Sequence, residues 1–141
     1  MIIDQKLLDE LSAQARSNPR LRQNYDLRNS GNDHSQRMVN AMEPGTVMPI
    51  HRHMKTSESI AILRGKLVMR LYDDNGTITD EFTMEPGGEH PMAQIEVGQW
   101  HSLDVLEEGT VVFEAKDGKY EALKEEDVMM LDDAIIQFDT K

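Results

Sequence analysis

The spacing of apolar residues changes along the chain, and the first segment has a helical period. In residues 4–17 the apolar positions that fall on one helical face are Leu7, Leu8, Leu11 and Ala15. Asp4 precedes them and is a residue type that favours the N-cap position. Asn18-Pro19 ends the segment, because the residue before a proline avoids helical backbone angles. We therefore predict a short N-terminal helix, followed by a polar, irregular segment up to residue 35.

From residue 36 to residue 112 and beyond, the pattern changes to short runs separated by glycine, proline and acidic turns. We expect strands at 36–42, 47–53, 59–63, 66–72, 77–83, 93–97, 101–106 and 110–116. Asp73-Asp74-Asn75-Gly76 lies between two of these runs, and an Asn-Gly pair there predicts a hairpin. Glu107-Glu108-Gly109 predicts a second hairpin in the same way. Many short strands at this spacing are typical of a sandwich or small barrel.

The last segment differs from the strand region. Residues 120–134 contain helix-compatible side chains and neither proline nor glycine, so we expect a helix there. A chain of 141 residues suits one domain. We divide that domain (1–141) into an N-terminal helix and irregular segment (1–35), a β-barrel (36–116) and an acidic tail (117–141).

Composition narrows the class of partner. The formal net charge of −11 argues against nucleic acid and anionic membranes, which bind positively charged surfaces. The chain has no cysteine, which removes disulfides and thiolate metal sites and suits a reducing cytoplasm. No signal peptide is evident and no apolar run approaches the roughly 18 residues of a membrane span. We expect a cytoplasmic protein whose partner is a small molecule.

Four residues form a candidate metal site: His51, His53, Glu58 and His101. On a strand His51 and His53 share one face, because side chains alternate. Glu58 reaches that face only after a turn, which the small and polar residues 54–57 supply. It then shares parity with the apolar Ile60 and Ile62, which predicts that its side chain points inward. Three imidazoles and one carboxylate suit one divalent transition metal ion, without choosing between Fe, Mn, Ni, Co and Zn. His34 and His90 lie in polar segments and are expected to be exposed loop residues.

The frame around these residues resembles the cupin superfamily. The segment from Gly45 to Gly65 matches the first cupin motif at every defining position. The second motif keeps Gly98 and His101, whereas its proline and asparagine positions hold Glu96 and Val105. The resemblance implies a mainly β fold, a jelly-roll barrel. The short helix before it and the helical tail behind it are expected from the sequence pattern. The resemblance also implies a homodimer, by analogy with cupins.

Further segments resemble the WbuC family of cupin-fold metalloproteins. They cover much of residues 5–120 and include 20–25, 35–46, 49–53, 63–67, 98–101 and 109–114. The resemblance implies a divalent metal held by the three histidines and the glutamate. It places some members beside bacterial surface-polysaccharide biosynthesis, and it implies no defined reaction.

Candidate substrate contacts come from the first barrel strand. They are Gln36, Arg37 and Asn40, and Asn24 in the preceding segment is a fourth candidate. Arg37 could clamp a carboxylate or phosphate with two parallel hydrogen bonds, or could equally be an edge-strand arginine on the surface. Tyr25 and Tyr72 could donate protons, although packing is the more common role of tyrosine.

Three functional hypotheses follow. The first is a metalloenzyme acting on a small polar molecule such as a sugar or sugar nucleotide, as an isomerase or epimerase, or as an oxygenase if iron is bound. The second is a non-catalytic module in which metal and barrel bind a sugar or an acid. The third treats the metal as a structural pin, in which case no cavity would open onto it.

Overall fold

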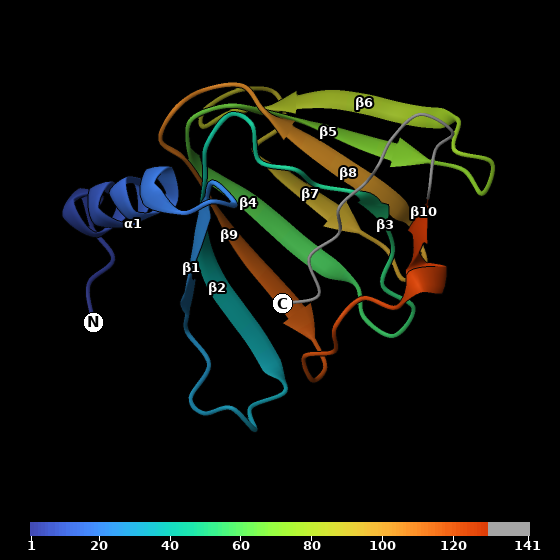
Figure 1. The fold of residues 1–141 in the computed structure, drawn as a ribbon, viewed down its shortest axis with the longest axis horizontal. Helices are drawn as coiled ribbons and strands as arrows, with labels where there is room; N and C mark the ends of the chain where they lie inside the picture. Colours follow the sequence, from blue (N-terminus) through green and yellow to red (C-terminus); the bar gives the residue numbers. More distant parts are fainter. Residues whose placement is uncertain (130–141) are drawn as a thin grey trace.

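The computed structural model describes residues 1–129. Within them, two antiparallel sheets of five strands face each other, and the one α-helix of this part of the chain lies outside them (Figure 1). The first sheet has the strand order β1 (Arg22–Asp26), β2 (Ser35–Met42), β9 (Thr110–Asp117), β4 (Glu58–Arg64) and β7 (Met92–Ile95). The second has the order β10 (Val128–Met129), β3 (Ile50–His51), β8 (Trp100–Val105), β5 (Leu67–Tyr72) and β6 (Ile78–Met84). Among the described residues, the outer strands β1, β7, β10 and β6 pair on one side only, so the jelly roll is a sandwich and not a closed barrel.

The helix α1 (Gln5–Ser17) forms where the apolar period predicted it. The Asp4 carboxylate accepts a hydrogen bond from the backbone N–H of Leu7 and caps the first turn. The buried face of the helix packs on the outer side of β2 and β9, in a cluster of Leu8, Leu11, Ala15, Val39, Ala41 and Val111. Burying this face holds the helix against the first sheet, away from the space between the sheets.

The main core lies between the two sheets and follows the alternation of the strands. Its buried members include Met42, Ile60, Ile62, Leu67, Met69, Met84, Leu103, Val105 and Val112. Directly opposed residues share a side of an antiparallel sheet, so Ile62 and Val112 point inward together, as do Met69 and Leu103. The apolar inward positions gather toward one end of the sandwich, which leaves the other end for polar side chains.

The hairpin at residues 73–76 is confirmed, since β5 pairs with β6. The second expected hairpin is wrong: β8 pairs with β3 and β5, whereas β9 pairs with β2 and β4. The turn between them therefore crosses from one sheet to the other. Its polar groups are satisfied without strand pairing, because Gly109 N–H donates to the Glu43 carboxylate and the Thr110 hydroxyl to the Glu107 carbonyl.

Three further expectations need correction. Residues 20–35 are not wholly irregular, because β1 pairs along its full length with β2 and its polar sequence hides the strand pattern. The strand expected at 47–53 is reduced to the two residues of β3. The helix expected at 120–134 is wrong for residues 120–129, which hold a loop, a 3-10 turn (Glu125–Asp127) and β10. Residues 130–134 of that expectation lie outside the described residues.

Tertiary pairing explains the correction in the tail. Val128 pairs with His51 across β10 and β3, and the Arg52 side chain binds the Asp127 carboxylate at 3.0 Å. These contacts outweigh the weak helical preference of the segment. Within residues 1–129, no helix is long and apolar enough to cross a membrane.

Candidate metal centre and adjoining cavity

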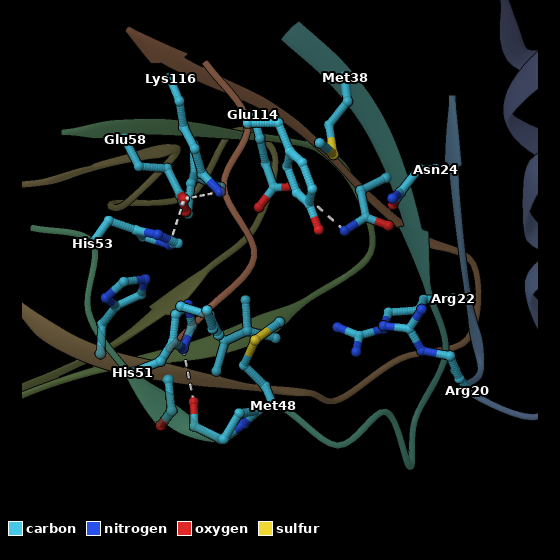
Figure 2. A pocket seen from close by; sticks show the side chains of 18 of the residues that line it. Arg20, Arg22, Asn24, Met38, Met48, His51, His53, Glu58, Glu114 and Lys116 are labelled. Atoms are coloured by element: carbon cyan, nitrogen blue, oxygen red, sulfur yellow. Dashed lines mark hydrogen bonds and ion pairs between the residues drawn. The ribbon is translucent and has the colours of Figure 1, made fainter. Parts of the chain in front are cut away.

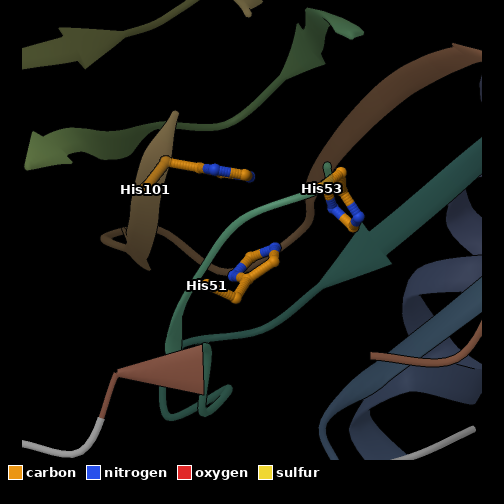
Figure 3. A group of neighbouring side chains, drawn as sticks. All are labelled: His51, His53 and His101. Atoms are coloured by element: carbon orange, nitrogen blue, oxygen red, sulfur yellow. The ribbon is translucent and has the colours of Figure 1, made fainter. Parts of the chain in front are cut away.

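Three of the four candidate ligands meet at one point between the sheets. His51 and His101 are directly opposed on β3 and β8, and His53 follows two residues after His51. One ring nitrogen from each histidine lies within 4.8 Å of the others. The rings of His51 and His101 have centroids 4.2 Å apart, and His53 completes the triangle at 5.1 and 5.7 Å. Figure 3 shows the three imidazoles turned toward a common space.

Backbone carbonyls fix the orientation of two of these rings. The Nδ1 atom of His51 lies 2.8 Å from the Pro49 carbonyl oxygen, and that of His101 lies 2.9 Å from the Gln99 carbonyl oxygen. A carbonyl can only accept, so each Nδ1 carries the proton and each Nε2 keeps a lone pair. This is the arrangement in which metal-ligating histidines are commonly held.

The remaining ring nitrogens fit a metal. The Nε2 atoms of His53 and His101 are buried and have no hydrogen-bond partner among residues 1–129. Burial of a polar atom without a partner is costly, and such atoms are rare in folded proteins. A cation bound between the rings would satisfy both nitrogens, so the donor set and its orphaned atoms fit a divalent transition metal.

Burial also keeps the histidines in the protonation state that metal binding needs. Desolvation lowers the pKa of His51 to about 3 and that of His53 to about 4, with further lowering from neighbouring positive groups. The pKa of His101 is also lowered by burial. All three imidazoles are therefore neutral at pH 7, and a metal ion would not compete with protons for their lone pairs.

Glu58, the fourth candidate ligand, lies at the edge of the histidine cluster. Its carboxylate is buried as its parity with Ile60 and Ile62 predicted, and lies 3.6 Å from His53 Nε2. The same oxygen is 3.1 Å from Lys116 Nζ. Burial raises the pKa of Glu58, but Lys116 and the three histidines together outweigh it and hold the pKa at about 2. Glu58 is thus an ionised carboxylate, shared between a lysine and the histidine cluster.

A cavity of about 310 Å³ opens from the histidine cluster. His51, His53 and His101 line one end of it, and Arg20 and Arg22 line the other. Figure 2 shows the two arginines across the cavity from His51 and His53, with Glu58, Glu114 and Lys116 along a third side. Asn40 also lines the cavity and donates from Nδ2 to the Glu114 carboxyl at 3.3 Å. Burial and the neighbouring Glu58 raise the pKa of Glu114 to about 7.

A strap of residues 118–124 runs beside this cavity and separates it from a second one of about 290 Å³. Tyr120, Glu121 and Leu123 line both cavities. The strap begins at Gly118, whose carbonyl accepts from the Gln36 side chain at 2.8 Å. In its middle, Glu121 forms an ion pair with the exposed Lys55 at 3.2 Å.

The structure separates the four residues that were expected to contact substrate. Asn24 and Asn40 line the main cavity, whereas Gln36 lines the second one and is bonded to Gly118. The Arg37 guanidinium lies in neither cavity, because Ser35, Asp33 and the Leu27 carbonyl hold it at the end of β2.

The remaining side chains named from the sequence lie away from the histidine cluster. Tyr72 is buried against Trp100 and bonds Ser102, consistent with packing. His34 is exposed as expected, but His90 is half-buried beside Phe82.

Sequence reasoning assigned no role to five charged residues that line the cavity: Arg20, Arg22, Glu114, Lys116 and Glu121. For two of them, strand parity is the signal that could have found them. Glu114 and Lys116 share parity with the buried Val112, so charges occupy inward positions of a strand that otherwise buries apolar residues.

The chain matches the model of a known protein family. The model of a family described as a domain of unknown function (DUF6016) matches residues 3–84, more than half of the chain. The chain belongs to this family. No curated protein sequence matches it significantly.

Solved structures resemble the fold of this DUF6016 chain. KdgF from Halomonas sp. superposes with a TM-score of 0.59 at 14% identity, over 73% of this chain and 84% of KdgF. The capsular polysaccharide assembling protein CapF from Staphylococcus aureus gives 0.55 at 24% identity, over 63% of this chain but only 24% of CapF. The Schizosaccharomyces pombe Cnp3 cupin domain gives 0.55 at 15% identity, over 70% of this chain and 65% of that domain. At these identities the likeness establishes the fold, and the expected cupin jelly roll is confirmed.

Proposed function

We propose that this chain is a metal-dependent cupin enzyme that acts on a small polar molecule such as a sugar derivative. The observation that carries the proposal is the convergence of three buried, neutral histidines on one end of a cavity. A structural metal would need no such cavity, whereas a catalytic one must leave room for substrate. The CapF resemblance and the WbuC-like segments support surface-polysaccharide metabolism as the setting. We also propose that the protein is a cytoplasmic homodimer.

Each side chain of the site has a role in this proposal. His51, His53 and His101 hold the metal, and Glu58 is the fourth ligand. The Pro49 and Gln99 carbonyls keep two of the rings in the binding tautomer. A divalent metal bound there supplies Lewis acidity towards a substrate oxygen or, if it is iron, reactivity towards dioxygen.

Glu114 is the group in the cavity best suited to hold or move a proton. It is buried, it faces the cavity beside Asn40, and its pKa of about 7 allows both protonation states near neutral pH. Isomerisation and epimerisation of sugars need a proton to be removed and returned. Glu114 therefore favours an isomerase or epimerase over an oxygenase. A non-catalytic binding module would bind sugars without incorporating solvent deuterium into them.

Metal analysis of the purified protein tests the proposal. We expect about one equivalent of a divalent transition metal in the wild-type protein, and in the control variant His34→Ala, whose side chain is exposed. His101→Ala removes a ligand and should weaken metal binding by roughly 100-fold or more. Glu58→Gln should weaken metal binding less, by about tenfold, because the Glu58 carboxylate is already ion-paired with Lys116.

Two results would contradict the proposal. One is stoichiometric metal in His101→Ala, measured after dialysis against a weak chelator. The other is wild-type protein that binds no transition metal ion after reconstitution with each candidate in turn. Circular dichroism of each variant would show that the fold is kept.

A further inference from the structure

Three neighbouring strands, β1, β2 and β9, place two amides and a carboxyl on one side of the cavity. Asn24 is directly opposed to Asn40 across β1 and β2, so their side chains share one face of the sheet. Asn40 Nδ2 donates to the Glu114 carboxyl on β9 at 3.3 Å. Figure 2 shows Asn24 and Glu114 on this side of the cavity. We refer to Asn24, Asn40 and Glu114 as the polar wall.

Asn40 has a buried acceptor that is not used. The side chain is only 6% exposed, and its Oδ1 atom is buried with no hydrogen-bond partner among residues 1–129. Its Nδ2 atom is already bonded to Glu114. Buried polar atoms are nearly always hydrogen-bonded, because an unmade bond costs free energy. The Asn40 Oδ1 atom accepts, so a donor such as a ligand hydroxyl would satisfy it.

The neighbours of Asn40 on the polar wall also suit hydroxyls. A carboxyl such as that of Glu114 accepts from a hydroxyl when it is ionised and donates to one when it is protonated. A hydroxyl can play both parts, so it fits Glu114 in either form. Asn24 is exposed and still lines the cavity, so it adds an amide where the cavity meets solvent. The polar wall therefore offers adjacent partners for more than one hydroxyl.

The charges of the cavity leave no cation reserved for an ionised group at the polar wall. Among the described residues, three cationic and three acidic side chains line the cavity: Arg20, Arg22, Lys116, Glu58, Glu114 and Glu121. Lys116 is paired with Glu58, and both arginines also have interactions within the protein. Glu121 is paired with Lys55. Recognition at the polar wall is therefore by hydrogen bonds to uncharged groups.

Cavity size and the apolar part of its lining limit the ligand further. About 310 Å³ is at the lower end of the roughly 300–1,000 Å³ typical of small-molecule sites, which suits a molecule of monosaccharide size. Met38, Met48, Ile60 and Leu103 also line the cavity. A sugar presents C–H groups between its hydroxyls, so it matches a lining that is part polar and part apolar.

We propose that the polar wall binds hydroxyls of a monosaccharide-sized substrate, one of which donates to Asn40 Oδ1. Asn40 then determines specificity, because it distinguishes a hydroxyl at that position from a hydrogen atom. This inference rests on the proposed function for the chemistry at the histidine end. The polar wall itself is built from residues that do not bind the metal.

NMR titration of zinc-loaded, ¹⁵N-labelled protein tests the polar wall with four neutral probes: D-glucose, D-galactose, D-mannose and L-fucose. Zinc is chosen because it is diamagnetic. At least one probe should bind with a Kd of millimolar order or lower. That probe should shift the side-chain amide signal of Asn40, which Asn40→Ala identifies by its loss. The corresponding signal of Asn32, an exposed residue that does not line the cavity, should stay in place.

The variants and a set of deoxy sugars measure the hydroxyl contact itself. Asn40→Ala should weaken binding of the best probe by about tenfold, and the control Asn32→Ala should bind it like the wild type. One of the singly deoxygenated analogues of that probe should bind the wild type about tenfold more weakly than the probe does. In Asn40→Ala the same analogue and the probe should bind within about twofold of each other. If Asn40→Ala fails to fold by circular dichroism, Asn40→Ser takes its place.

The outcomes separate the polar wall from the metal-dependent function. Metal-loaded protein that binds none of the four sugars would overturn the polar wall and leave the metal site standing. Unchanged sugar affinity in the folded Asn40 variant would also overturn it, as would a deoxy penalty of the same size in that variant and the wild type. Sugar binding that depends on Asn40 in protein that takes up no metal would support the polar wall and overturn the metal-dependent function instead.

Discussion

The interior between the two sheets has an apolar half and a polar half, and the same strands build both. On each of four strands the inward side chain changes character within two to four residues. The pairs are Met42 and Asn40 on β2, Val112 and Glu114 on β9, Ile62 and Glu58 on β4, and Leu103 and His101 on β8. Backbone and parity are alike in the two halves, so the difference is one of side-chain chemistry alone.

The comparison separates stability from function. The apolar half removes large side chains from water and thereby stabilises the fold. The polar half buries carboxylates, an amide and imidazoles, which lose hydration that their partners only partly replace. Stability lost in the polar half is the cost of a site that can hold charge, protons and a cation. Substitutions of inward residues in each half compare how much the two halves contribute to the free energy of unfolding.

The largest effect should come from the apolar half of β2. Met42 is fully buried, so Met42→Ala should lower the free energy of unfolding by about 2–5 kcal/mol through lost burial and a residual cavity. Met92→Ala, at a side chain 58% exposed, should change it by less than about 0.5 kcal/mol. Urea unfolding measures both. Metal content of folded Met42→Ala should match the wild type, and a loss of metal would show that the two halves are not separable.

An intermediate effect of opposite sign should come from Glu114 on β9. Its pKa is about 7 in the fold against 4.5 for the ordinary carboxyl, so the folded state holds a proton that the unfolded state has lost between those values. Stability therefore falls as pH rises from about 4.5 to 7 and stays low above 7. Glu114→Gln cannot ionise, and at pH 8 it should be more stable than the wild type by up to about 3 kcal/mol.

The measurement is urea unfolding of metal-free protein at pH 4 and pH 8, and the gain should vanish at pH 4. Glu89→Gln removes an exposed carboxyl and should show no such gain at either pH. A Glu114→Gln protein that is less stable at pH 8 would mean that nearby cations hold Glu114 ionised in the fold.

The smallest effect should come from Asn40, two residues before Met42. Asn40→Ala loses the bond to Glu114 but also removes an acceptor that is buried without a partner, so its free energy of unfolding should stay within about 1 kcal/mol of the wild type. Thermal and urea unfolding of Asn40→Ala and Met42→Ala compare the two losses in free energy of unfolding directly. Equal losses at the two positions would show that the polar half is packed like the core and holds no open site.

The histidine cluster could be predicted because most of its information is local. His51 and His53 lie two positions apart, so strand alternation alone predicts that they share a face. Parity alone placed Glu58 inside. What parity could not show is that Lys116, from a strand more than fifty positions later, would bind the Glu58 carboxylate. Pairing partners that lie far apart in sequence leave no local pattern.

The same limit explains the wrong hairpin and the missed arginines. The turn at residues 107–109 looks like any tight connection, and only the burial of inward side chains on both β8 and β9 decides that these strands belong to opposite sheets. Arg20 and Arg22 alternate on a segment too polar to be recognised as a strand. Their place on the cavity wall could not be predicted, because the cavity exists only once both sheets are assembled.

The two-residue strand β3 carries His51 between β8 on one side and β10 on the other. A shortened version of the protein that stops before Val128 would leave His51 with an open flank, far in sequence from where the cut was made. Truncating the carboxyl end to aid crystallisation would remove a strand that supports an imidazole, so cation uptake should be measured before and after truncation.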